Sequence, residues 1–365
     1  MKNGIFKTVK SGIVGRKPMI QISRVIPRTT ANILRGGAVV AFSLFASNAA
    51  APAAGFEVES GPVSSAAGKV ADATAPGSNA AGAGGCAVST PNVPDGPDPA
   101  GGCFPGPSNT GVPPGTALSD YSGPCTITVA DTVIDSKTVT CKILVRANGL
   151  IIKNSVLKGG VSGLVGQGAS FTIQDSFLDN GVCVNCSVDG WNFTILRTEI
   201  TGSNRGVYCM NTCLVQDSWI HGTALDPTSE WHASAVRVEQ NATLVHNVLA
   251  CDWTGPFNND RLGCSADLTG YPDFAPIRNN TIDTNLFMAN PVGLGYCAYG
   301  GGSAKKPYST DPTNATYIVF KNNVFQRGPK YRCGTWGPIT DFERGRTGNV
   351  WTGNVWDRGG IVPPR

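Results

Sequence analysis

The sequence is poor in histidine and in long apolar runs. Only three of its 365 residues are histidine, and the apolar run from Gly37 to Ala46 is too short to cross a bilayer as a helix. From Thr126 onward, apolar residues do not recur with a period of about 3.6, which excludes an architecture of amphipathic helices. Asn-Gly and Asp-Gly pairs, the turns typical of antiparallel hairpins, are scarce, which argues against a β-sandwich.

Acidic residues are absent from the first 50 positions, which carry eight Lys or Arg residues. This basic start, the apolar run and the small residues after it predict a signal peptide within residues 1–50. The protein is then expected to be secreted or held at the cell surface, with no membrane span after signal removal. Of the 29 Lys and Arg, 21 remain against 25 Asp and Glu, so the mature chain lacks the basic surface of a nucleic-acid-binding protein.

Residues 51–115 are rich in Ala, Gly, Pro and Ser and poor in large apolar side chains. Such a composition buries too little apolar surface to offset the entropy of ordering. It predicts a disordered linker that contains one small segment closed by Cys86 and Cys103. The ordered domain is expected to span residues 116–365.

The chain has twelve cysteines, an even number that suits an exported and oxidised protein. A zinc site is disfavoured, because Cys183-x-x-Cys186 has no second pair or histidine at the required distance. Position in the sequence predicts four disulfides: Cys86 with Cys103, Cys125 with Cys141, Cys251 with Cys264, and Cys297 with Cys333. The pairing among Cys183, Cys186, Cys209 and Cys213 stays open.

One phrase recurs along the chain, for example as FTIQDSFL from Phe171 and LVQDSWI from Leu214. Its small polar position is occupied by Ser155, Ser176, Thr198, Ser218, Asn247, Asn285, Asn323 and Asn354, which are separated by 21, 22, 20, 29, 38, 38 and 31 residues. A repeat of this length with growing insertions predicts a parallel solenoid whose later coils carry loops. The small polar residues are expected to stack and form a hydrogen-bonding ladder.

These coil phrases resemble right-handed parallel β-helix proteins of the pectate-lyase-like superfamily, over roughly residues 126–357. The resemblance implies an all-β fold, a single-stranded right-handed parallel β-helix. It leaves the function open, because that superfamily contains lyases, hydrolases, transferases, epimerases and non-catalytic adhesins. A phrase common in it, IHG…H-x-D-G-I, is present with Ser234 and Ala235 in place of Asp and Gly.

Residues able to do chemistry gather in the insertions, which we expect at one corner of the solenoid. They are His221, Asp226, Glu230 and His232 in one insertion, Asp252, Trp253, Asp260 and Arg261 in the next, and Lys330 and Arg332 in a later one. Acids, histidines, cations and an aromatic along one corner would form an elongated groove, the shape that a polymer requires. A polysaccharide, acidic by preference, is therefore the expected partner.

Lyases of the superfamily remove the C5 proton of a uronate with a Lys, Arg or His base, while a cation or Ca²⁺ neutralises the carboxylate. The resemblance thus implies a polysaccharide lyase in which His232 or Lys330 takes the proton and His221 assists the leaving oxygen. Arg261 and Arg332 would hold the carboxylate. Further substrate contacts are expected from Asp252, Trp253, Asp260, Asp267 and Tyr271, of which the last two, with Asp273, are also candidates for a Ca²⁺ site.

Two other functions remain open. A glycoside hydrolase or glycan transferase would use paired carboxylates, for which Asp226, Glu230, Asp252 and Asp260 are candidates. The NTD…DD signature of polygalacturonase-like members is not found, which disfavours this alternative. The third function is that of a non-catalytic carbohydrate-binding protein of the cell surface, with the linker as its stalk.

Overall fold

The computed structural model describes residues 85–163, 168–184, 187–226, 231–255, 263–290 and 292–364. The predicted signal peptide, the linker up to residue 84, and Glu230, Asp260 and Arg261 lie outside these residues. Within them the chain is all-β, and no α-helix occurs. It follows that this part of the chain offers no helix long and apolar enough to span a membrane.

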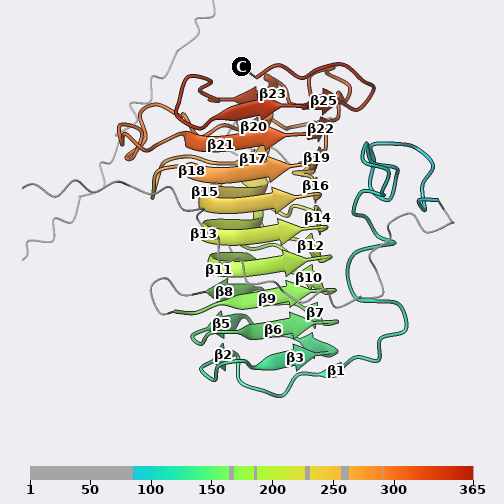
Figure 1. The fold of residues 1–365 in the computed structure, drawn as a ribbon. Coiled ribbons are helices and arrows are strands. Elements are labelled where there is room, and N and C mark those ends of the chain that lie inside the picture. The colour runs from blue at the N-terminus through green and yellow to red at the C-terminus, as the bar shows by residue number, and fades with distance from the viewer. Residues whose placement is uncertain are drawn as a thin grey trace, which may run out of the picture. The chain divides into compact units, whose positions relative to one another are not determined.

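The strands form three ladders, in which each strand pairs in parallel with a strand of the next repeat (Figure 1). Ladder A contains β1 (Ser119–Asp120), β4 (Lys137–Val139), β7 (Val156–Leu157), β10 (Phe177–Asp179), β12 (Glu199–Thr201), β14 (Trp219–Ile220), β16 (Val248–Leu249), β19 (Leu286–Phe287), β22 (Val324–Phe325) and β25 (Val355–Trp356). Ladder B contains β2 (Thr126–Ile127), β5 (Ile143–Val145), β8 (Val161–Gly163), β11 (Val188–Leu196), β13 (Arg205–Gln216), β15 (Ala233–Val245), β17 (Cys264–Thr269), β20 (Tyr296–Tyr299) and β23 (Gly337–Thr340).

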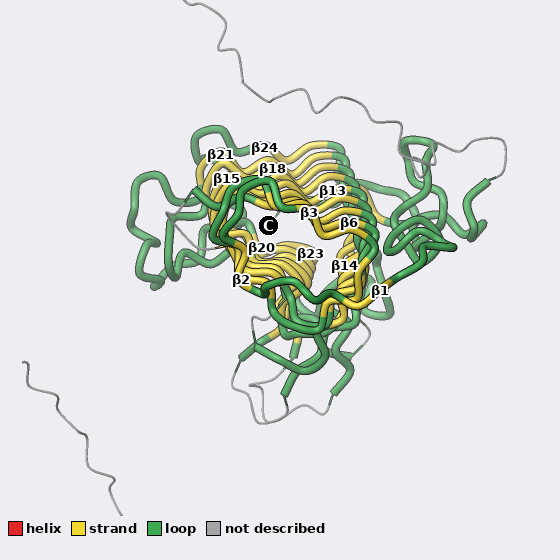
Figure 2. The backbone as a smooth tube through the Cα atoms, turned by 90° about the horizontal axis from the view of Figure 1, so that it is seen from below, coloured by secondary structure: helices red, strands yellow, loops and turns green. Residues whose placement is uncertain are grey.

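Ladder C contains β3 (Val133–Asp135), β6 (Leu150–Lys153), β9 (Phe171–Gln174), β18 (Arg278–Asp283), β21 (Thr316–Lys321), β24 (Val350–Thr352) and the second halves of β11, β13 and β15. These three long strands continue from ladder B into ladder C, so the two ladders form one 15-stranded sheet. Seen along the stack, the three ladders surround a common interior (Figure 2). The arrangement is compatible with a parallel β-helix.

The interior is filled by columns of apolar side chains, because every second residue of a strand points inward. In ladder C the parallel register stacks Ile152, Ile173, Ile195, Val215, Leu244, Ile282 and Phe320, which are all buried. In ladder A the ring of Phe287 lies on that of Phe325, with centroids 4.5 Å apart. Each repeat thus buries its apolar face against the next one.

The predicted ladder of small polar residues is confirmed at the corner between ladders C and A. All eight of its residues are buried, and the Asn285 amide accepts from the backbone N–H of Asn247 at 3.0 Å and donates to Asn323 at 3.1 Å. The residue before each of them is left-handed in most repeats, including Arg197 and His246 with φ of 46° and 52°. A non-glycine residue rarely adopts this conformation, so the buried hydrogen bonds stabilise a turn that the sequence alone disfavours.

The segment 85–115 packs on ladder A, contrary to the prediction of a disordered linker up to residue 115. Phe104 is fully buried against Val248, Leu286 and Val324. Asp98 lies 3.1 Å from His246, and Asn92 donates to the carbonyl of Asp357 at 2.8 Å. Composition underestimated the order of this segment, because one buried aromatic side chain and the Cys86–Cys103 disulfide offset much of the ordering entropy.

Five disulfides join described residues, and the four predicted ones are among them. The fifth, Cys209–Cys213, lies within β13 and resolves one of the open pairings. Cys183 is disulfide-bonded as well. Such a number of disulfides is typical of an oxidising, extracellular environment.

Candidate functional site

Loops leave the stack at two corners, one on either side of ladder B (Figure 2). One set joins ladder A to ladder B, before β15, β17, β20 and β23, and the other joins ladder B to ladder C, after β17, β20 and β23. The sequence predicted a single corner with insertions. Because there are two, ladder B becomes the floor of a groove whose walls are the two sets of loops.

The groove has a central cleft of about 910 Å³ over β13, β15, β17 and β20. A recess of about 390 Å³ shares Arg205, Trp231 and Arg237 with this cleft, and a third hollow of about 520 Å³ shares Tyr296 and Trp336 with it. The three together extend from β11 to β23, six neighbouring strands of ladder B. With strands about 4.8 Å apart, the groove is roughly 24 Å long, enough for several sugar residues of a polymer.

One row of side chains runs along the floor of the groove, from strand to strand. In the parallel register Tyr208 pairs with Arg237 and Arg237 with Thr269. Tyr299 follows beside Thr269, because Leu268 pairs with Ala298, and Tyr299 itself pairs with Thr340. Each repeat therefore contributes one polar or aromatic side chain to the same line, at right angles to the strands.

Arg237 is the centre of an ion-pair network on this floor. Its Nη2 lies 3.1 Å from the Asp273 carboxylate and 3.9 Å from that of Glu239, and it donates to the carbonyl of Tyr271 at 3.2 Å. Lys306 pairs with the other side of Asp273 at 3.0 Å and lies over the ring of Tyr271. The network thus joins a strand of ladder B to the loops of the second corner.

The two carboxyl groups on Arg237 have pKa values shifted in opposite directions. Burial raises the pKa of Glu239, although a hydrogen bond from Tyr208 and the charge of Arg237 lower it. Burial also acts to raise the pKa of Asp273, but hydrogen bonds from Lys306 and Arg237 outweigh it, so the net shift is downward. As pH falls, Glu239 therefore takes up a proton before Asp273 does.

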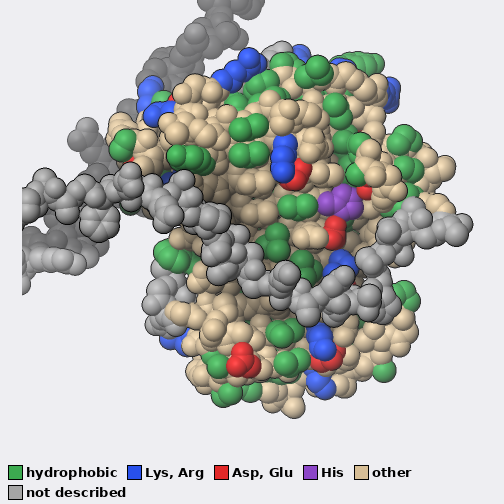
Figure 3. Space-filling model, viewed as in Figure 1, with side chains coloured by type: hydrophobic (Ala, Val, Ile, Leu, Met, Phe, Trp, Pro, Cys, Tyr) green, Lys and Arg blue, Asp and Glu red, His purple; other side chains and the backbone are tan. Residues whose placement is uncertain are grey.

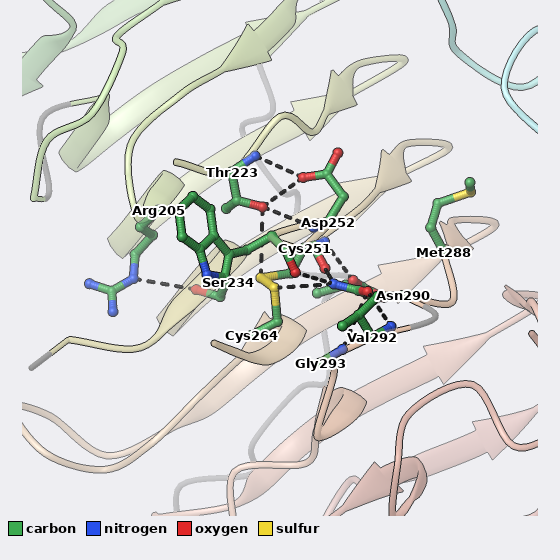
Figure 4. Close-up of a disulfide and its surroundings, with 12 residues drawn as sticks. Arg205, Thr223, Ser234, Cys251, Asp252, Cys264, Met288, Asn290, Val292 and Gly293 are labelled. Atoms are coloured by element: carbon green, nitrogen blue, oxygen red, sulfur yellow. Dashed lines mark hydrogen bonds between the residues drawn. A yellow bond between two sulfur atoms is a disulfide. The ribbon is translucent and has the colours of Figure 1, made fainter. Parts of the chain in front are cut away.

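Arg205 is the second cation of the floor. Its Nε lies 3.4 Å from the hydroxyl of Ser234, the contact drawn in Figure 4, and its guanidinium lies over the ring of Tyr208. The guanidinium of Arg237 lies over the same ring, and the Cζ atoms of both arginines are 5.3 Å from the ring centroid. Burial, followed by the charge of Arg237, lowers the pKa of Arg205 to about 10. Two guanidinium groups so close together favour an anionic ligand between or beside them.

Exposed aromatic rings line the walls. Trp231 and Phe274 are 55% and 62% exposed at the two sides of the recess, and Trp336 is 65% exposed where the cleft meets the third hollow. Large aromatic side chains so exposed on one face mark a binding surface. On the face shown in Figure 3, several of the charged side chains lie beside others of opposite sign. Ion pairs such as Arg197–Asp175, at 2.7 Å, are of this kind.

Three of the predicted residues, His232, Tyr271 and Asp273, line the central cleft. Lys330 and Arg332 lie in the loop before β23 and are exposed, and Lys330 donates at 2.8 Å to Thr335, which does line the cleft. These two therefore stand at the rim. Asp226 is half-buried in the loop after β14 and is not among the residues that line the three cavities.

His221 is placed away from the groove, contrary to the role predicted for it. It follows β14 on ladder A, where its ring stacks on Trp219 with centroids 3.5 Å apart and its Nε2 lies 2.9 Å from Glu199. The strand phrase before His221 predicts that it lies at the surface of a coil. The phrase does not indicate on which of the three ladders that surface lies.

Three other predicted contacts are structural. The Asp252 carboxylate accepts from the backbone N–H of Gly222 and Thr223 at 2.9 and 2.8 Å, which holds two loops together. Figure 4 shows its contact with Thr223. Trp253 is half-buried and packs on the core. Asp267 is fully buried inside the stack, where it accepts from the N–H of Cys251 at 2.7 Å and burial raises its pKa, so it cannot contact a substrate in the groove.

No described residues form a convincing Ca²⁺ site. The one group of His, Cys, Asp and Glu side chains that lies close enough to share an ion is Asp267 with Cys297 and Cys333. The two sulfurs form a disulfide with each other, and Asp267 offers a carboxyl whose pKa is raised. Hard cations prefer several ionised oxygen ligands, which this group lacks.

The groove residues that the sequence analysis missed are Arg205, Tyr208, Arg237 and Glu239. They belong to the second strands of their repeats, in RGVY from Arg205 and SAVRVE from Ser234. A charged residue within an otherwise apolar strand was the signal, since such residues are rarely buried unless paired or functional. Most of the residues predicted from the sequence lie in loops, whereas these four lie on the strands that the loops flank.

Comparisons of the chain with protein-family models, with curated proteins and with solved structures find no match. Fold and site define a disulfide-bonded protein of stacked parallel sheets. A groove with cations and exposed aromatics crosses one of its faces.

Proposed function

We propose that the protein is a secreted right-handed parallel β-helix of the pectate-lyase-like kind that binds an acidic polysaccharide in this groove. The observation that carries the proposal is the meeting of Arg205, Arg237 and Lys306 with exposed Trp231 and Trp336 in one elongated cleft. Guanidinium groups bind carboxylates in a planar, bidentate manner, and indole rings pack on the apolar faces of sugars. A polymer with carboxylates fits both features.

The proposed reaction is cleavage beside a uronate by β-elimination. A base takes the proton from C5, the electron pair is delocalised into the neighbouring carboxylate, and the C4–O bond then breaks with the pair leaving on oxygen. His232 is the candidate base, because it lines the same cleft as the two arginines. Arg205 and Arg237 take the role that the sequence analysis gave to Arg261 and Arg332: they stabilise the charge that develops on the carboxylate. With a pKa of about 10, Arg205 is charged at neutral pH.

The test is the ultraviolet absorbance of the unsaturated uronate product, followed over a panel of acidic glycans with and without Ca²⁺. We expect absorbance to rise with at least one glycan. Replacing Arg205 or His232 by Ala should lower the rate by about a hundredfold or more, as loss of one catalytic group does. Arg358→Ala is the control, since this side chain is 82% exposed and lies at the end of the stack. Unchanged turnover in Arg205→Ala would refute the assignment.

A second candidate function, glycoside hydrolysis, is favoured by the pair Glu239 and Asp273. Their carboxyl oxygens both lie near Nη2 of Arg237, so they are separated by at most about 7 Å, the two distances laid end to end. That limit permits the separation of about 5–5.5 Å found in retaining enzymes. Opposite pKa shifts are what an acid and a nucleophile require. Formation of new reducing ends without an unsaturated product would favour hydrolysis over elimination. In the Glu239→Gln variant these reducing ends should no longer form.

If a glycan bound but remained uncleaved after long incubation, the protein would be a non-catalytic carbohydrate-binding protein. The same groove residues would then serve recognition alone.

A further inference from the structure

The recess beside the central cleft differs from it in chemistry. Its walls include Trp191, Trp231, Met210 and Phe274, and its floor is Tyr208 with Glu239. Lys306 and His232 line the central cleft only. Arg205 and Arg237 border both cavities, so Lys306 and His232 distinguish the central cleft, and the aromatic and apolar walls distinguish the recess.

Three charged side chains border the recess, Arg205, Arg237 and Glu239, and Arg205 is engaged by the hydroxyl of Ser234 at 3.4 Å. Glu239 is buried, accepts a hydrogen bond from the Tyr208 hydroxyl and lies 3.9 Å from Arg237. Nη2 of Arg237 is shared with Asp273 and the carbonyl of Tyr271. A substrate carboxylate placed here would lose its water beside apolar walls and a second carboxyl group. Burying a charge in such surroundings is costly.

An uncharged sugar residue avoids this cost and gains contacts. Phe274 and Trp231 offer exposed aromatic surface that the C–H groups of a sugar ring can cover, and burying it stabilises the complex in proportion to its area. Glu239 and Gln240 also line the recess, where they can form hydrogen bonds with the hydroxyl groups of the sugar. The recess thus recognises a neutral residue and rejects a charged one, a specificity that rests on an unfavourable contact as much as on a favourable one.

We infer that the ligand is a heteroglycan in which an uncharged sugar residue stands next to the uronate. The central cleft binds the uronate through its cations, and the recess binds the neutral neighbour between Trp231 and Phe274. This inference rests on the proposed function and narrows its substrate class: a polymer charged on every sugar places a carboxylate in the recess, whereas one charged on every second sugar does not.

The test is calorimetric binding of oligomers of equal length. One is an oligogalacturonate, charged on every sugar; the others are a hyaluronan oligomer and an oligomer in which galacturonate alternates with rhamnose, both charged on every second sugar. We expect at least one alternating oligomer to bind about tenfold or more tightly than the oligogalacturonate, a difference that one aromatic contact and one avoided buried charge can supply.

Variants separate the two parts of the groove. Phe274→Ala should weaken the alternating oligomer about tenfold and leave the oligogalacturonate unchanged. Lys306→Gln should weaken both, and Tyr331→Ala, at a ring that is 72% exposed and lines none of the three cavities, should weaken neither.

Equal or tighter binding of the oligogalacturonate, or an alternating oligomer insensitive to Phe274→Ala, would overturn the inference. If no oligomer bound, the proposed function would fail and the inference with it. Preserved ranking without cleavage would support the inference and remove only the catalytic part of the proposed function.

Discussion

Replacing Phe104 by Ala should detach the segment 85–115 from ladder A without unfolding the stack. The ring is fully buried against Val248, Leu286 and Val324, and removing a buried Phe side chain costs about 3–5 kcal/mol. The remaining attachments of the segment are isolated polar contacts, such as the hydrogen bond from Asn92 to Asp357 and the Asp98–His246 ion pair, each worth about 1 kcal/mol. The detached population should therefore rise by a factor of about a hundred to a few thousand.

Hydrogen exchange is the assay, because it reads local opening separately from global unfolding. The amide of Gly111, which donates to the carbonyl of Arg197 in the stack, should exchange faster by the same factor. Amides of β13 and β15 should keep their rates. The matched control is Phe274→Ala, which removes the same side chain from an exposed position and should leave the segment protected. Uniform acceleration of the segment and the strands together would refute the reasoning, since the segment would then not open as a separate unit.

Other predictions concern polar groups and the core. The His246 ring lies between Asp217 at 2.7 Å and the segment's Asp98 at 3.1 Å. Burial lowers the pKa of His246, but the two carboxylates outweigh burial and raise it. Docking supplies the Asp98 part of this rise, so docking should be stronger below the raised pKa and weaken as pH rises through it. Proteolysis of the segment against pH checks this, and a flat profile would contradict it. Asn285→Ala should cost about 2–4 kcal/mol in denaturant unfolding, because it leaves buried partners unpaired, whereas Asn279→Ala in the exposed row should cost little. Replacing Cys297 and Cys333 together by Ser should cost about 2–4 kcal/mol, measured in the same way; no change would mean that this link does not restrain the unfolded chain.

The stack of parallel repeats could be predicted from the sequence because its cause is local. Each repeat carries its own β-branched run and its own small polar residue, so spacing alone placed Ser218, Asn247 and Asn285 in one buried ladder. Disulfides between neighbouring repeats followed from the same spacing, as Cys297 with Cys333 illustrates.

Sequence reasoning did less well with the candidate site. It found His232 and Tyr271, which loops carry to the cleft, but it also selected Asp267, which points into the stack, and His221, which lies on ladder A. A loop residue has no periodicity, so its direction cannot be read from its neighbours. Asp267 lies in β17 and not in a loop, and its buried carboxylate accepts a hydrogen bond from the N–H of Cys251, a partner in the preceding loop that the sequence does not indicate.

By itself, then, the sequence determined an all-β chain of parallel repeats, its polar ladder and four of its disulfides, because these follow from side-chain alternation and repeat length. Only the tertiary structure decided that loops flank ladder B on both sides and that Arg205, Arg237 and Tyr299, from three different repeats, form one floor. It also decided that the segment 85–115 is docked. The physical reason is that these features depend on contacts between residues about 30 to 150 positions apart, which no local pattern encodes.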